Sequence, residues 1–72
     1  MSTETRQARF RRIAPKRVKR VLRELELLGN TSNINHYRFS QEEVDKIFNA
    51  IEQQLKETRF RFLIKRSRGF EL

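Results

Sequence analysis

Apolar residues recur at spacings of three and four in two segments of the chain, and this spacing predicts two amphipathic helices. The apolar face of the first segment consists of Val18, Val21, Leu22, Leu25 and Leu28. Pro15 suits the first turn of a helix, because the amide proton that proline lacks would have no partner there. Gly29 supplies a C-terminal stop, since glycine adopts the left-handed conformation without a Cβ clash. The first helix is therefore predicted over about residues 15–28.

The second helix has a sequence signature at its start. The segment SQEE, Ser40 to Glu43, is a capping box, in which the serine hydroxyl and the glutamate carboxylate each accept from the other residue's amide. Phe39 and Val44 occupy the two positions of a hydrophobic staple. The apolar face continues with Val44, Ile47, Phe48, Ile51 and Leu55. We therefore predict a helix over about residues 41–58.

The segment between these helices, Asn30 to Phe39, is rich in Asn, Ser and Thr. Such side chains hydrogen-bond to nearby backbone, so a structured turn is expected here rather than a linker. A connection of this length between two amphipathic helices predicts an antiparallel hairpin in which the two apolar faces bury each other. The expected fold is mainly α, with Ile34, Tyr37 and Phe39 closing one end of the hairpin.

The segment RFRFLIKR, residues 59–66, fits two conformations. A continuing helix would point Phe60, Leu63 and Ile64 away from the apolar face, into solvent or a partner. An extended chain would instead alternate Phe and Arg between two faces, and could pair with an extended RFRRI at residues 9–13. Both conformations remain open. The domain expected at this point covers residues 9–66, between a flexible N-terminal tail, residues 1–8, and a C-terminal tail, residues 67–72.

Charge is distributed unevenly along the chain, whose net charge is +8. Residues 1–23 contain nine Lys or Arg and one Glu, residues 24–58 contain three against seven acids, and residues 59–72 contain five against one. Clustered cations are what phosphate contacts use. In the first helix, Lys16, Lys19, Arg20 and Arg23 project opposite the apolar face. The candidate phosphate contacts are Arg9, Arg11, Arg12, Lys16, Lys19, Arg20, Arg23, Arg59, Arg61, Lys65 and Arg66.

Several kinds of chemistry lack the residues they need. The chain has one His, no Cys and two Gly, so a nucleophile paired with a base, a thiolate metal site and a glycine-rich phosphate loop are not expected. The carboxylates of Glu42, Glu43 and Asp45 suit the start of a helix without any metal. No apolar run is long enough to span a bilayer, and the N-terminus lacks the apolar run of a signal peptide. We expect a cytoplasmic protein that is not an enzyme and needs no cofactor or metal.

The function expected from these patterns is nucleic-acid binding, to DNA or RNA, through phosphate contacts. The alternative is a protein-interaction adaptor or small inhibitor whose basic face binds an acidic protein surface. A third alternative, a structural or ribosome-associated peptide, shares the same charge pattern. A chain of 72 residues has little room for a core, so association into a homodimer or binding to a partner would help it fold.

Residues 28–55 resemble a pattern found in small uncharacterised bacterial and phage-borne proteins. In that pattern a helix ends in LGN or LGK, an SN-rich turn contains an Asn-Tyr pair, and a helix of the form EEV..IF..IE..L follows. The matching residues here are Leu28, Gly29, Asn30, Ser32, Asn33, Asn35, Tyr37, Glu43, Val44, Ile47, Phe48, Ile51, Glu52 and Leu55. His36, which separates Asn35 from Tyr37, departs from the pattern. The resemblance implies a structured turn and no particular activity.

Overall fold

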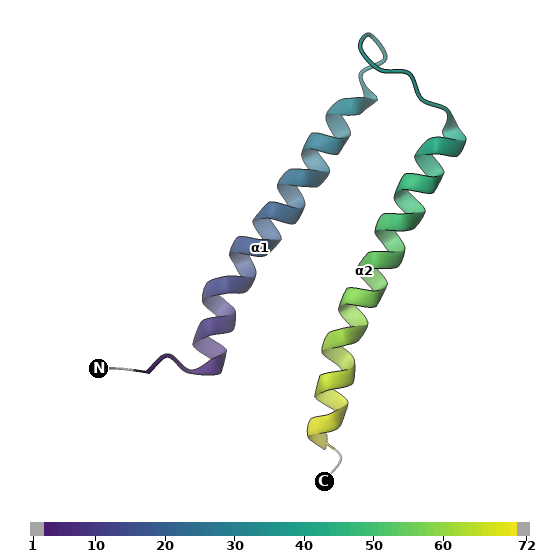
Figure 1. Cartoon of the computed structure of the whole chain (residues 1–72). Helices are drawn as coiled ribbons and strands as arrows, with labels where there is room; N and C mark the ends of the chain where they lie inside the picture. The colour runs from purple at the N-terminus through teal and green to yellow at the C-terminus, as the bar shows by residue number, and fades with distance from the viewer. Residues whose placement is uncertain (1–2, 71–72) are drawn as a thin grey trace. The chain divides into compact units, whose positions relative to one another are not determined.

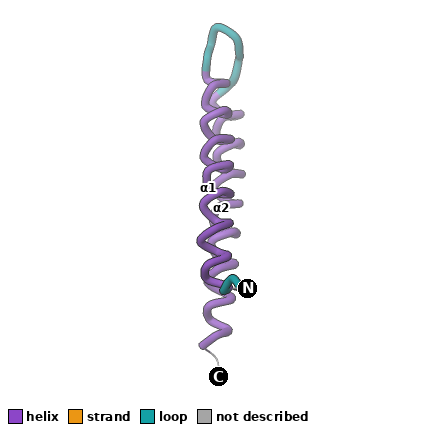
Figure 2. Tube along the Cα trace, turned by 90° about the vertical axis from the view of Figure 1, so that its left-hand side faces the viewer, coloured by secondary structure: helices purple, strands orange, loops and turns teal. Residues whose placement is uncertain are grey.

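The computed structural model describes the backbone of residues 3–70 and the side chains of residues 3–63. Along the chain, helix α1 covers Arg6–Gly29, the short 3₁₀ helix η1 covers Asn30–Ser32, and helix α2 covers Gln41–Phe70 (Figure 1). The described residues contain no strand, and Figure 2 shows them as helices and loops. The prediction of a mainly helical chain with two long helices is thus confirmed. The chain forms two compact units, Met1–Arg38 and Phe39–Leu72, which are described separately below.

Helix α1 begins nine residues before the predicted start, so residues 6–8 do not belong to a flexible tail. Thr5 is its N-cap: the Thr5 hydroxyl accepts from the Ala8 amide at 3.0 Å, and the Thr5 carbonyl accepts from the Arg9 amide at 3.0 Å. Pro15 therefore lies inside the helix instead of in its first turn, and the interpretation of Pro15 as a start signal is wrong. The helix lacks the hydrogen bond that an amide at position 15 would donate, yet it continues on both sides of the proline.

The apolar spacing already contained a signal for this longer helix. Phe10 and Ala14 precede Val18 at intervals of four, so the apolar face of α1 extends backward past the proline without a change of register. Residues 9–13, which were considered as an extended segment, lie within α1.

The end of α1 differs from the expected glycine stop. Gly29 has φ −58° and ψ −30°, which is right-handed helical geometry. The Asn30 amide reaches back to the carbonyls of Glu26, Leu27 and Leu28, and the backbone tightens into η1. The Thr31 hydroxyl also donates to the Leu28 carbonyl at 2.7 Å. The helix thus ends by tightening, which satisfies its last carbonyls without a left-handed residue.

Asn33 organises the loop that follows η1. Its side-chain Oδ1 accepts from the Asn35 amide at 3.0 Å. Its backbone carbonyl accepts from the amides of His36, at 3.1 Å, and Tyr37, at 2.9 Å. One asparagine therefore fixes the conformation of the residues after it, and the prediction of a structured turn is confirmed.

Helix α2 begins at Gln41, as the capping box predicted. The Glu43 amide donates to the Ser40 hydroxyl at 3.1 Å, and the Ser40 amide donates to the Glu43 carboxylate at 2.8 Å. The helix continues to Phe70, well past residue 58, so the alternative of a short strand over residues 59–66 is wrong and that of a helix extension is correct. A strand here would need a partner strand, and residues 9–13, the candidate partner, are helical. The predicted tail from residue 67 is also helical as far as Phe70.

The described side chains of both units are largely exposed. Among the side chains that the structure describes, none is fully buried, and the half-buried apolar residues are Ile13, Ala14, Leu28, Val44 and Ile51. On the apolar face of α1, Val21 is 58% exposed and Leu22 60% exposed. Helices in water take most of their stability from packing an apolar face against another surface. The apolar faces of α1 and α2 are therefore surfaces for such packing.

Candidate nucleic-acid interface

A row of cations follows one side of α1. Each residue of an α-helix turns by about 100°, and six cations fall within a sector of about that width, opposite the apolar face. We call this row the cationic stripe; it consists of Arg9, Arg12, Lys16, Lys19, Arg20 and Arg23. At a rise of 1.5 Å per residue, the stripe extends for about 21 Å along the helix. Because α1 begins at Arg6, the stripe includes two cations that precede the helix expected from sequence.

Arg11 lies on a different side of α1 from the cationic stripe. Its position falls between those of Val18 and Leu22 around the helix, on the apolar side. Arg17 lies at the border between the apolar face and the stripe. Arg11 was grouped with its neighbours by sequence proximity, and the helix gives it a different surface.

Two cations of the stripe hold an internal carboxylate. Arg12 Nε donates to Glu4 Oε2 at 2.8 Å, and Arg12 Nη2 donates to Glu4 Oε1 at 2.9 Å. Arg9 Nε lies 3.9 Å from the same Oε1 atom. The hydrogen bonds from Arg12 lower the pKa of Glu4 and raise that of Arg12. This paired arrangement is the strongest geometry available between a guanidinium and an oxyanion.

The sequence alone does not identify Glu4 as a residue of this site. Glu4 lies before the N-cap and eight residues from Arg12, so the periodicity of the helix does not extend to it. Its partnership depends on the path of the backbone through Thr5, and spacing alone gives no sign of it.

The remaining stripe residues have fewer internal partners. Arg23 Nη1 lies 3.7 Å from Glu26 Oε1, a loose contact between side chains that are 64% and 70% exposed. Within residues 3–63, Lys16, Lys19 and Arg20 form no ion pair. The central part of the stripe is therefore open to an external anion.

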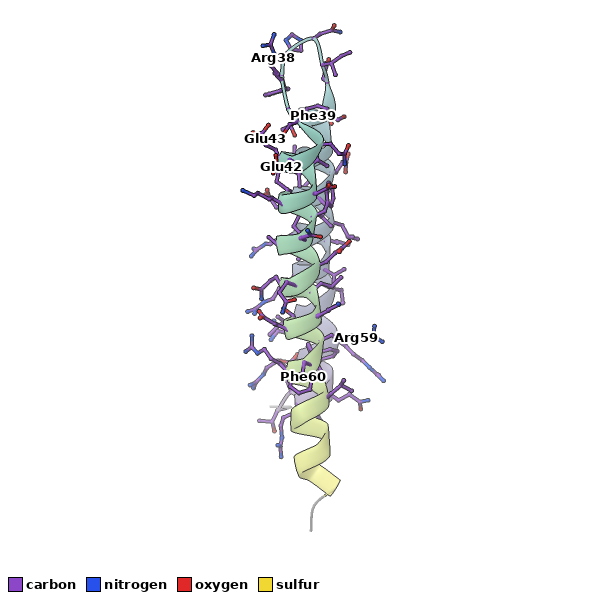
Figure 3. The ribbon with its side chains drawn as sticks, turned by 90° about the vertical axis from the view of Figure 1, so that its right-hand side faces the viewer. Arg38, Phe39, Glu42, Glu43, Arg59 and Phe60 are labelled. Carbon is purple, nitrogen blue, oxygen red and sulfur yellow. The ribbon has the colours of Figure 1, made fainter. Side chains whose placement is uncertain are left out.

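Helix α2 does not gather its cations in the same way. Arg59 and Arg61 are two residues apart, so they leave the helix on nearly opposite sides. Figure 3 shows Arg59 in the C-terminal half of α2, far along the helix from Glu42 and Glu43 in its first turn. The side chains of Lys65 and Arg66 lie outside the described residues. The part of α2 before Arg59 is acidic, with Glu42, Glu43, Asp45, Glu52 and Glu57.

Other kinds of site find little support in the described residues. The side chains there form no cluster of His, Asp and Glu that could hold a metal ion. His36 lies in the loop, where its amide serves the Asn33 turn. In the part of the chain that the structure describes, neither helix is long and apolar enough to cross a membrane.

The cationic stripe is thus the most distinctive chemical feature of the described side chains. Comparison with known proteins adds no second line of evidence, since no family model, no curated protein and no solved structure matches the chain.

Proposed function

We propose that the protein binds nucleic acid through phosphate contacts made by the cationic stripe of α1. The observation that carries the proposal is the alignment of six Lys and Arg residues on one side of a continuous helix, opposite its apolar face. Phosphates recur along a nucleic-acid strand, so a row of cations is electrostatically complementary to them. The face opposite an apolar one is ordinarily a mixture of polar and charged residues, whereas residues 9–23 contain no Asp or Glu at all.

The stripe favours affinity over sequence recognition. Phosphate contacts orient a protein on its nucleic acid but carry no sequence information, which comes from contacts with base edges. The stripe contains only Lys and Arg, which contact phosphates whatever the sequence and which, among base edges, bind chiefly guanine. We therefore expect weak sequence preference and strong salt dependence, because each neutralised phosphate of a duplex contributes about −0.9 to the slope of log K against log salt.

An antiparallel hairpin of α1 and α2 belongs to the same proposal. Both helices have an apolar face that remains exposed when each unit is considered alone, and the ordered turn around Asn33 connects them. Packing these faces together would give each helix the apolar contacts it needs. The cationic stripe would remain accessible in such a hairpin, because it lies opposite the face that packs.

The test is a fluorescence-anisotropy titration of labelled duplex DNA, single-stranded DNA and RNA at two salt concentrations. The variant Arg20→Glu with Arg23→Glu changes two stripe residues. Its matched control, Lys46→Glu with Lys56→Glu, makes the same change of charge on α2. If the stripe makes the contacts, the α1 variant loses at least about tenfold in affinity at moderate salt and its duplex-DNA salt slope falls by roughly 2, while the control loses much less. Equal losses in both variants would show that only net charge matters and would refute the role of the stripe.

A second candidate function is protein binding, which the C-terminal half of α2 favours. Phe60 and Leu63 are 57% and 54% exposed, and they lie away from the face formed by Val44, Ile51 and Leu55. Exposed apolar side chains beside cations suit an adaptor or inhibitor that binds an acidic protein surface with apolar patches. Such an interface would weaken much less with salt than phosphate contacts would. Light scattering of the same samples would show whether a second copy of the chain is the partner.

A further inference from the structure

We propose that Arg9 and Arg12 form a clamp for one phosphate group, and that the Glu4 carboxylate occupies this clamp in the unbound protein. The inference rests on the proposed function and adds to it an internal competitor for the nucleic acid. Its starting point is that an oxyanion already lies between these two arginines, with Arg12 Nε and Nη2 donating to it at 2.8 and 2.9 Å.

A phosphate group matches what the clamp offers. The guanidinium group presents two parallel N–H donors, a geometry that fits carboxylate and phosphate oxygens equally well. Glu4 Oε1 also lies 3.9 Å from Arg9 Nε, so both arginines are within ion-pair distance of one oxygen atom. A phosphate oxygen at that position would receive contacts from the same two side chains, and its additional oxygens and charge would strengthen them.

The carboxylate can leave the clamp without unfolding the start of α1. The cap contacts of this helix come from Thr5: its hydroxyl accepts from Ala8 and its carbonyl accepts from Arg9, both at 3.0 Å. Glu4 precedes the cap and supplies none of these bonds. Its side chain can therefore move into solvent while the helix keeps its N-terminal hydrogen bonds.

The clamp also lies in line with the rest of the stripe. Arg12 and Lys16 are four residues apart, so a strand whose phosphate enters the clamp continues past the open cations Lys16 and Lys19. Glu4, in contrast, reaches only the N-terminal end of the stripe. A polyanion thus gains contacts along about 21 Å of helix, while the carboxylate contacts only Arg9 and Arg12, and this difference drives the exchange.

The experiment compares Glu4→Gln with Glu24→Gln. Both variants remove one negative charge from the same unit, and among residues 3–63 Glu24 forms no ion pair. With labelled duplex DNA as the probe, we expect Glu4→Gln to bind about two- to fivefold more tightly than Glu24→Gln, the range of one surface ion pair. The salt slope of Glu4→Gln should also be steeper than that of Glu24→Gln, by up to about 0.9. In Glu24→Gln, phosphate binding displaces the Glu4 carboxylate, which then takes up a cation from solution and cancels part of the cation release; in Glu4→Gln there is no such carboxylate.

A double-mutant cycle with Arg12→Gln assigns the effect to the clamp. On the Arg12→Gln background, Glu4→Gln should give little gain beyond that of Glu24→Gln, because Arg12, which donates both hydrogen bonds to the carboxylate, is absent and only the 3.9 Å contact with Arg9 remains. Circular dichroism of each variant checks that helix content is retained. Equal affinity and slope for Glu4→Gln and Glu24→Gln would overturn the clamp while leaving nucleic-acid binding intact. If neither variant nor the natural sequence binds any nucleic acid, the proposed function fails and the clamp with it.

Discussion

Replacing Pro15 with alanine tests helix α1 at the residue that is least favourable for a helix. Proline has no amide proton to donate to the Arg11 carbonyl, and its ring crowds that carbonyl in a helix interior. In the structure α1 nevertheless continues from Arg6 through Pro15 to Gly29. The residues before the proline make up a segment too short to remain helical alone, because isolated helices below about 12 residues are marginal in water. Residues 6–14 are therefore helical only if they remain continuous with the rest of α1.

The expected magnitude follows from the position of the proline. Pro is about 3 kcal/mol less favourable than Ala in a helix interior. An energy of this size corresponds to about a hundredfold change in the equilibrium between helical and frayed forms of the segment before the proline. Pro15→Ala should therefore increase the amide-exchange protection of residues 8–14 by up to about that factor, since these are the residues that fray as one segment. The protection of residues 20–28 should change much less, because they are beyond the turn that the proline disturbs.

The measurement is residue-resolved hydrogen exchange together with Cα chemical shifts, on the natural sequence and on two variants. Ala14→Gly is the matched control, because it alters the neighbouring residue and lowers helix propensity by about 1 kcal/mol without restoring an N–H donor. It should decrease the protection that Pro15→Ala increases. Helical shifts over residues 6–14 in the natural sequence would agree with α1 as described. Coil-like shifts over those residues in both the natural sequence and Pro15→Ala would refute a helix that begins at Arg6.

Two further substitutions test the ends of the helices. Gly29→Ala should stabilise α1 by about 0.5–1 kcal/mol, because Gly29 has φ −58° and an added Cβ would meet no atom within 4 Å. Thermal melting followed by circular dichroism measures the gain, and a loss of stability would show that this residue needs a conformation which alanine avoids. Ser40→Ala should destabilise the start of α2 by about 1 kcal/mol, because the Glu43 amide would lose its hydroxyl acceptor at 3.1 Å. Hydrogen exchange at residues 42–44 should detect this loss, and Ser40→Thr should largely avoid it. Unchanged exchange in Ser40→Ala would show that the capping box does not stabilise this end of the helix.

The parts of the fold that could be predicted from the sequence are those with local causes. Ser40 and Glu43 are three residues apart, and their reciprocal bonds need only the first turn of a helix. The turn around Asn33 is similar, since one side chain and one carbonyl organise the residues immediately after it. Signals of this kind contain both partners within a few residues, so the sequence displays them completely.

The start of α1 could not be fixed in this way because two signals conflict there. Pro15 is favourable at the beginning of a helix and unfavourable in its interior, so one residue supports two different starting points. The apolar spacing through Phe10 and Ala14 decides between them, but it does so only when read across the proline. Over residues 59–64 the difficulty was different, because alternating Arg and Phe side chains satisfy the period of a strand while also extending an existing helix.

The same difference between local and longer-range causes applies to the candidate site. The spacing of Lys16, Lys19, Arg20 and Arg23 is enough to group them on one side of a helix, whereas Arg11 is their neighbour in sequence only. The partnership of Glu4 with Arg12 spans eight residues and a change of backbone direction at the cap. No periodicity predicts such a pair, so the internal carboxylate could be found only in the structure.

The cationic stripe and the stability of α1 are connected through electrostatics. Its cations stand three or four residues apart, and like charges at this spacing oppose helix formation by about 0.2–0.5 kcal/mol per pair. Glu4 at one end and Glu26 near the other neutralise only part of the row. The phosphates of a polyanion bound along the stripe would attract these cations and so offset the repulsion between them. Binding and helix formation should therefore stabilise each other, and the residues before Pro15, where the helix is weakest and the Arg9–Arg12 clamp lies, should respond most.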